Sequence, residues 1–291
     1  MSIHKPAILL IGHGTRVADG IAEFHCLADR LRAALPERLF AIGFLELSAP
    51  SIRESLEALI QRGVTEIVAI PAMLLTASHI KNDIPNELNA VQTRYPHIKI
   101  SYGTALETHP YMLQAAEEKI ATAEEAFNIH YKRNNALLMV IGRGTSDSDA
   151  NANVSKITRL LWEKMGFGWA TTCYSGVTVP LVAESLERSH RLGYPWLIVF
   201  PYVLFAGRLL RQIHTIVDAY QAKYPKVQVS KAPYFRDHPL VVRTFLERLR
   251  QTEGGIGHMN CQLCQYKEPI VGYEHRYGMP QRIHLQHSNS V

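Results

Sequence analysis

The chain has 291 residues, which fits two domains of ordinary size, and its hydrophobic fraction of 47% is typical of packed proteins rather than disordered ones. No stretch approaches the roughly 18 consecutive apolar residues that span a bilayer, so we expect no membrane partner. The formal net charge of +5 suits an anionic ligand. Because the chain has no long run of Lys or Arg, we expect no nucleic-acid partner.

The first half of the chain alternates short apolar runs with segments of helical periodicity. In chain order, strands are predicted at residues 7–11, 40–45, 66–70 and 98–101, and helices at residues 18–35, 51–61, 82–95 and 111–126. Nearly continuous apolar strands that alternate with helices indicate a parallel sheet covered by helices on both faces. The predicted fold class is therefore α/β.

The second half repeats the first at an offset of about 130 residues, a period too long for a solenoid. Gly12-His13-Gly14-Thr15 reappears as Gly142-Arg143-Gly144-Thr145, and His109-Pro110 reappears as His238-Pro239. Strands are predicted at residues 136–141, 170–174, 197–200 and 227–229. We therefore predict two tandem duplicated domains, at residues 1–127 and 128–250, and an irregular tail at residues 251–291.

Three polar residues of the first half directly follow predicted strands: His13 the first, Glu46 the second and His79 the third. Because carboxyl ends of parallel strands meet at one edge of a sheet, we expect these side chains to converge. Imidazole nitrogen suits Co²⁺, Ni²⁺ and Fe²⁺, and two His with a carboxylate leave coordination positions open. In the second half Arg143 and Arg208 replace the two His, so a metal site is expected in the first half.

The segments Leu9 to Arg16, Phe44-Leu45-Glu46 and Ser78 to Asp83 resemble the sirohydrochlorin chelatases, class II chelatases that insert cobalt or iron. The resemblance covers both halves of the chain. It implies that His13 and His79 hold the metal to be inserted, Co²⁺ or alternatively Fe²⁺ or Ni²⁺, with Glu46 close by. It also implies that sirohydrochlorin, a tetrapyrrole rich in carboxylates, lies in the cleft between the two domains.

The chemistry of insertion assigns further roles. The metal displaces two pyrrole protons, and Glu46 or a His that is not on the metal can act as the base, so His13, Glu46 and His79 are the predicted catalytic residues. Guanidinium groups match carboxylates. The predicted substrate-binding residues are Gly14, Thr15, Arg16, Ser78, Lys81, Arg143 and Arg208.

Two other functions stay open. A metal or tetrapyrrole carrier without turnover could use the same His pair, but it would not need Glu46 as a base. A different metal-dependent α/β enzyme, such as a hydrolase, would need a nucleophile elbow or a richer carboxylate cluster, which the sequence lacks. We favour a lyase that inserts cobalt over one that inserts iron, for cobalamin or siroheme biosynthesis. The N-terminus has no signal-peptide pattern, which predicts a cytoplasmic protein.

The tail contains Met259-Asn260-Cys261-Gln262-Leu263-Cys264. Longer members of the resembled family carry a similar tail, which implies an iron–sulfur cluster. A cluster needs four thiolates, so a [2Fe–2S] cluster shared across a homodimer would use Cys261 and Cys264 of both copies. Zinc held by Cys261, Cys264 and two tail His is the main alternative, and a tail without any ligand is the third.

Overall fold

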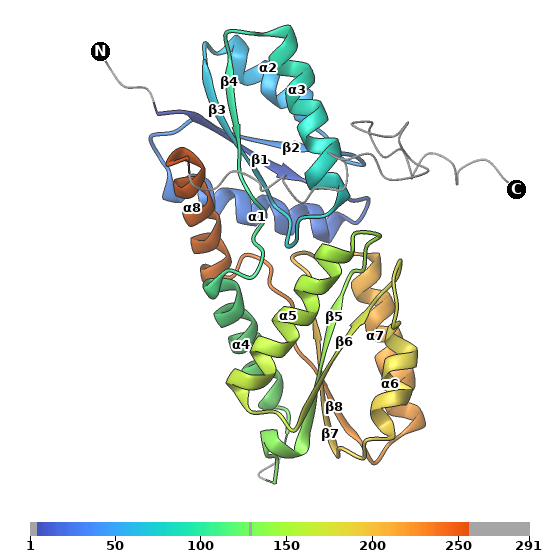
Figure 1. The fold of residues 1–291 in the computed structure, drawn as a ribbon. Coiled ribbons are helices and arrows are strands. Elements are labelled where there is room, and N and C mark those ends of the chain that lie inside the picture. Colours follow the sequence, from blue (N-terminus) through green and yellow to red (C-terminus); the bar gives the residue numbers. More distant parts are fainter. Residues whose placement is uncertain (1–4, 128–129, 256–291) are drawn as a thin grey trace, which may run out of the picture.

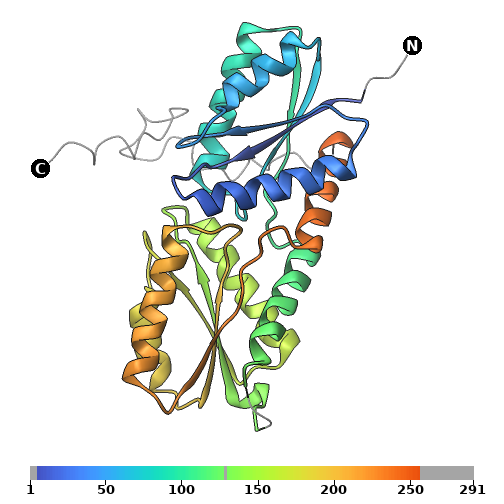
Figure 2. The same cartoon turned by 180° about the vertical axis from the view of Figure 1, so that it is seen from behind.

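The computed structural model describes residues 5–127 and 130–255, which form two four-stranded parallel sheets (Figures 1 and 2). The first sheet, in the order β2-β1-β3-β4, contains β1 (Ala7–Gly12), β2 (Phe40–Phe44), β3 (Glu66–Pro71) and β4 (Lys99–Tyr102). The second, in the order β6-β5-β7-β8, contains β5 (Ala136–Gly142), β6 (Trp169–Tyr174), β7 (Trp196–Pro201) and β8 (Gln228–Lys231). The predicted duplicated α/β fold is confirmed.

Helices connect the strands in both halves. They are α1 (Ala18–Ala34), α2 (Ile52–Gln61), α3 (Ile84–Arg94), α4 (Pro110–Glu124), α5 (Ser148–Met165), α6 (Val182–His190), α7 (Arg208–Lys223) and α8 (Pro239–Glu253), with short turns η1 (His79–Asp83) and η2 (Arg133–Asn135). The bounds of α1 to α4 agree with the predicted ones to within two residues, whereas the turn η1 was not predicted. Within the described ranges, no helix is both long and apolar enough to cross a membrane.

The central strand of each sheet is buried on both faces, as its apolar sequence predicts. All six residues of β1 and all seven of β5 are buried. Ile8 and Leu10 join one hydrophobic cluster, whereas Leu9 and Ile11 join another on the opposite face of the sheet, because successive side chains of a strand alternate. Burial on both faces fixes the position of the strand in the sheet, and therefore the position of the loop that follows it.

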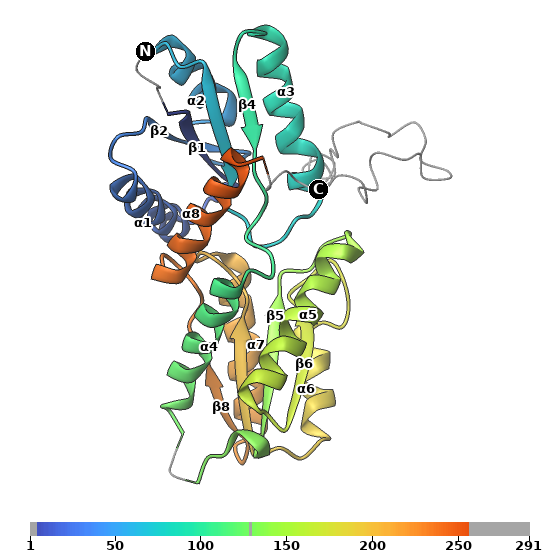
Figure 3. The same cartoon turned by 60° about the vertical axis from the view of Figure 1, so that its left-hand side comes forward.

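The last helix of each repeat packs on the other half of the molecule. Helix α4 closes the first repeat, yet it contacts α5, β7 and β8 of the second. Helix α8 closes the second repeat, yet it contacts α1, β3 and β4 of the first, so the two helices lie end to end along one side (Figure 3). The predicted boundary between residues 127 and 128 follows the repeat in sequence, whereas the packing exchanges one helix in each direction.

The carboxyl edges of the two sheets face each other. Glu23 in α1 accepts hydrogen bonds from the Ala206 backbone N–H, at 2.6 Å, and from the Tyr234 hydroxyl, at 2.7 Å. A Cβ atom at Gly20 would lie 2.4 Å from the Ala206 carbonyl oxygen, so glycine is needed for this close approach of α1 to the second half. The loops that carry the candidate site residues therefore lie where the two halves meet.

Candidate functional site

The backbone brings His13 and Glu46 together. Gly14 has φ +94°, and a Cβ atom there would lie 1.7 Å from the Glu46 carbonyl oxygen. The Glu46 N–H also donates to the His13 carbonyl oxygen at 3.0 Å. The loop after β1 is thus seated directly on the loop after β2, in a way that only glycine at position 14 permits.

Of the three predicted residues, His13 lies close to both Glu46 and His79. Nε2 of His13 lies 3.4 Å from Oε1 of Glu46, and the His13 and His79 ring centroids are 4.9 Å apart with the rings nearly perpendicular. Nε2 of His13 is buried and makes no hydrogen bond within the described chain. Across residues 5–127 and 130–255, no three His, Cys, Asp or Glu side chains stand in a ready-made ligand cluster. The arrangement offers imidazole nitrogen beside a carboxylate.

His79 is oriented by a carboxylate that the sequence reasoning missed. His79 begins the π-helical turn η1, and its Nδ1 lies 2.7 Å from Oδ2 of Asp83, the last residue of that turn. This contact favours the tautomer protonated on Nδ1, which presents the Nε2 lone pair, and metal-binding His residues commonly have such a carboxylate partner. The signal in the sequence was the spacing of four between His79 and Asp83.

The electrostatic surroundings keep His13 uncharged. Burial lowers the pKa of His13, and the positive charge of Arg143 lowers it further, against the opposing effects of a hydrogen bond to the Gly14 carbonyl and of Glu46. Neutral imidazole is the form that binds a metal. Arg143 is an exposed residue, and the partial burial of its guanidinium lowers its pKa against the opposing charge of Glu46, which is near enough to interact with it. The residue that replaces His13 in the second half therefore acts on the site of the first.

Lys81, expected on the substrate, is held instead by the second half. Its Nζ lies 2.7 Å from Asp147 and 3.4 Å from Asp149, and its side chain is 8% exposed. This ion pair links η1, the turn that carries His79, to the start of α5. The structure thus gives Lys81 a place in the contact between the halves, which the sequence did not indicate.

The other predicted substrate-binding residues have different surroundings. The hydroxyl of Thr15 accepts from the Val17 N–H, and the Thr15 N–H donates to Ser48, so Thr15 shapes its own loop. Arg16 and Arg208 are exposed, and neither forms an ion pair with another described residue. Ser78 immediately precedes η1. Cys261 and Cys264 lie outside the described residues.

Exposed apolar side chains lie next to Glu46 and next to Gly176, which stands at the equivalent position of the second half. Leu47 is 50% exposed after β2, and Val177 and Val179 are 75% and 72% exposed after β6. Leu47 and Val177 have φ of 61° and 67°, a region that residues with side chains rarely adopt. Such solvent exposure cannot be read from an apolar sequence, so this surface was missed. Its position beside the polar site suggests contact with a ligand that is partly apolar.

Comparisons with known proteins agree with this arrangement. A family model described as CbiX matches residues 7–123 and again residues 137–252. A sirohydrochlorin cobaltochelatase of Priestia megaterium is 32% identical over 268 residues, 92% of this chain and 87% of that protein. A sirohydrochlorin ferrochelatase of Bacillus subtilis is 33% identical over 85% of this chain and 92% of its own length.

Solved structures give the same result. The structure of SirB from Bacillus subtilis with Fe³⁺ covers 88% of this chain and 100% of its own, with a TM-score of 0.76 and 32% identity. SirB in complex with cobalt, from Bacillus subtilis subspecies spizizenii, has a TM-score of 0.73 over the same shares of both chains. Both similarities extend over the two halves, and both of those structures contain a metal.

Proposed function

The chain belongs to the CbiX family, and on that premise we propose that it is a sirohydrochlorin chelatase, a lyase that inserts Co²⁺ or Fe²⁺ into the tetrapyrrole. The observation that carries the proposal is the convergence of His13, His79 and Glu46, with Nε2 of His13 buried and without a hydrogen-bond donor or acceptor among the described residues. Two imidazoles hold a divalent ion as substrate while leaving positions open for macrocycle nitrogens.

In this proposal Glu46 is the base. Insertion replaces two pyrrole protons by one divalent ion, so proton acceptors are needed beside the metal. The Glu46 carboxylate, 3.4 Å from Nε2 of His13, is placed to accept one proton, and an imidazole released from the metal can accept the other. Asp83 has a positioning role, because it sets the His79 tautomer and ring direction.

The substrate would contact charged and apolar groups at the facing edges. Arg143 lies at the site, and Arg16 and Arg208 are exposed guanidinium groups available to macrocycle carboxylates. Leu47, Val177 and Val179 offer apolar contact to a flat conjugated ring. Gly14, Thr15 and Ser78 belong to the loops that hold this surface, and Lys81 supports it through Asp147.

We propose cobalt or iron as the inserted metal, since relatives of both kinds match at similar identity, and we keep cobalt first as in the sequence analysis. The product would accordingly serve cobalamin or siroheme biosynthesis in the cytoplasm. The predicted ligands of the tail, a [2Fe–2S] cluster shared by a homodimer or alternatively zinc, stay predictions, because Cys261 and Cys264 lie outside the described residues.

The test is the visible spectrum of anaerobic sirohydrochlorin mixed with Co²⁺ and the protein. The wild type and His97→Ala, which removes an exposed His of the first half, should shift the spectrum rapidly. His13→Ala and His79→Ala should not accelerate the shift beyond metal alone. If the wild type also fails to accelerate it while binding metal, a metal or tetrapyrrole carrier is the better assignment.

A further inference from the structure

In the second half of the molecule, the segment after the exchanged helix α4 covers the amino end of the sheet. Tyr131 has its ring centroid 4.8 Å from that of Phe127 and 5.7 Å from that of Trp196, the first residue of β7. The Tyr131 hydroxyl lies 2.6 Å from Glu124, the last residue of α4. The chain that leaves α4 therefore packs back against the start of β7.

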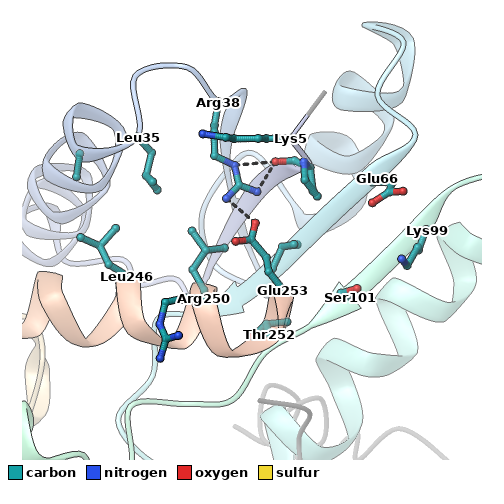
Figure 4. Close-up of a pocket in the computed structure, with 14 residues that line it drawn as sticks. Lys5, Leu35, Arg38, Glu66, Lys99, Ser101, Leu246, Arg250, Thr252 and Glu253 are labelled. Atoms are coloured by element: carbon teal, nitrogen blue, oxygen red, sulfur yellow. Dashed lines mark hydrogen bonds and ion pairs between the residues drawn. The ribbon is translucent and has the colours of Figure 1, made fainter. Parts of the chain in front are cut away.

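In the first half, the corresponding place is an open pocket. It has a volume of about 610 Å³ and lies between α8, the end of α1 and the first residues of β3 and β4 (Figure 4). Leu35, Val68, Leu246 and Leu249 give it an apolar lining. Its charged residues are of both signs and include Lys5, Lys99 and Arg250 as well as Glu66 and Glu253.

The internal repeat makes the two places equivalent. Glu253 ends α8 as Glu124 ends α4, 129 residues earlier, and each carboxylate lies 2.6 Å from an arginine, Arg38 and Arg133 respectively. Glu66 begins β3 as Trp196 begins β7. The first half lacks the aromatic residue at this position, which leaves room at the pocket floor for another apolar group.

We propose that residues 256–259 of this chain occupy the pocket. They follow α8 directly, and the last turn of α8, at Thr252 and Glu253, already lines it, so no linker is needed. Ile256 stands 129 residues after Phe127, the side chain that packs at the equivalent place in the second half. Ile256 and Met259 supply the two apolar side chains for the lining, as Phe127 and Tyr131 do for the other sheet.

Docking of residues 256–259 has a consequence for the Cys pair. Cys261 and Cys264 would start at the amino edge of the first sheet, whereas His13 follows β1 at the carboxyl edge. Six strand residues at about 3.3 Å each separate the two edges by roughly 20 Å. The tail thus holds its Cys pair on the first domain, away from the metal to be inserted.

A photocrosslinker tests this docking without reference to chelatase activity. In the full chain, Ile256→p-benzoylphenylalanine is irradiated and the crosslinked peptides are identified by mass spectrometry. The expected products are intramolecular and join position 256 to β3 or β4. The same probe at Ile283, also apolar and in the tail, should give less than a tenth of this product. Ser101→Trp, which fills the pocket from β4, should reduce the yield from position 256 at least fivefold.

The same products can refute the proposal. Crosslinks between two chains would show that a second copy covers the pocket, and crosslinks to the loops around His13 would place the tail at the metal site. Equal yields from positions 256 and 283 would show no specific docking. As a second readout, Ile256→Asp should lower the Tm by about 2–4 °C, whereas Ile283→Asp should not.

Discussion

His13 and Arg143 occupy equivalent places in the two halves, and they act on one carboxylate. Burial lowers the pKa of both residues, and the charge of Glu46 opposes that shift in each. With His at positions 143 and 208 as well, the molecule would have two imidazole pairs facing each other. With Arg at these positions, the proposed function has one half hold the metal while the other presents cations suited to substrate carboxylates. The duplication has thus separated two tasks between equivalent residues.

Asp83 is the residue whose removal best tests how His79 is held. Asp83→Asn should lower Co²⁺ affinity and insertion rate by roughly 10–100-fold, because the carboxylate that fixes the His79 ring is lost while its volume is kept. Isothermal titration with Co²⁺ and the insertion assay measure the two effects. Asp218→Asn, which removes a carboxylate paired with Lys231 away from the site, is the control. Unchanged Co²⁺ affinity in Asp83→Asn would remove Asp83 from the site.

Gly14 and Gly63 form a matched pair for the loop contact. Both have positive φ, +94° and +80°, but a Cβ atom at Gly14 would collide with the Glu46 carbonyl oxygen, whereas at Gly63 nothing lies within 4 Å. Gly63→Ala should cost about 1 kcal/mol of unfolding free energy from backbone strain alone. Gly14→Ala should cost clearly more and should also slow insertion, because Glu46 must move. Equal losses in urea unfolding would contradict this contact.

The sequence predicted His13, Glu46 and His79 because each follows a strand, and parallel topology brings strand ends together. Residues whose roles depend on the other half were harder to assign. Lys81 was expected on the substrate, yet its partner Asp147 is 66 residues away in sequence and belongs to the second repeat. Leu47 and Val177 were missed because nothing in their local sequence shows that an apolar side chain is left in solvent.

At the level of elements, both exchanged helices begin with a histidine cap that titrates. Nδ1 of His109 accepts from the Tyr111 N–H at the start of α4, and Nδ1 of His238 accepts from the Leu240 N–H at the start of α8. Only the neutral ring can accept there. Burial lowers the pKa of both, helped by Arg248 at His109 and by Lys119 at His238, against Glu247 and Glu118 respectively.

These caps predict a stability that depends on pH. The pKa of each His is lower in the folded state than in the unfolded state. The contribution of the caps to the free energy of unfolding is therefore full above the unfolded pKa of about 6.5 and declines as the pH falls below it. The loss should reach about 1 kcal/mol for each cap, the usual worth of an N-cap. The double variant His109→Asn with His238→Asn keeps both caps but removes their titration. Measured by urea unfolding, it should therefore lose less unfolding free energy than the wild type between pH 7.5 and 5.5. An identical pH profile in both proteins would contradict the assignment.

Helix bounds were predictable because periodicity and caps are local, but the place where a helix packs was not. The helical spacing of α4 is the same whichever sheet it covers, so the sequence suggested that it closes its own repeat. Contacts with β7 and β8 show the exchange. The turn η1 was not predicted either, and its π-helical geometry brings His79 and Asp83, four residues apart, into contact.

For the whole molecule, the ion pair between Lys81 and Asp147 should contribute to the contact between the halves. Their side chains are 8% and 4% exposed. Lys81→Met should lower the unfolding free energy by about 3 kcal/mol, because Asp147 is left buried and unpaired. Adding Asp147→Asn, which preserves the cap at the start of α5, should restore part of the unfolding free energy that Lys81→Met loses. The exposed pair of Lys223 with Glu187 serves as the control, and Lys223→Met should change stability far less.

The exchange of α4 and α8 also predicts what one repeat does alone. A fragment of residues 1–127 lacks α8, which covers β3 and β4, and its α4 lacks the sheet on which it packs. Since α4 and α8 are equivalent in the repeat, two fragments can exchange α4 reciprocally and cover both sheets.

We therefore expect the fragment 1–127 to fold as a homodimer in sedimentation equilibrium, with two facing His13–His79 pairs and no Arg143. A fragment of residues 1–106, which has no helix to exchange, should remain unfolded by circular dichroism. A folded monomer of the fragment 1–127 would show that α4 can close its own sheet, and that the exchange depends on the presence of the second repeat. The dimer would instead show that the exchange is a property of each repeat, which the duplicated chain has joined into one molecule.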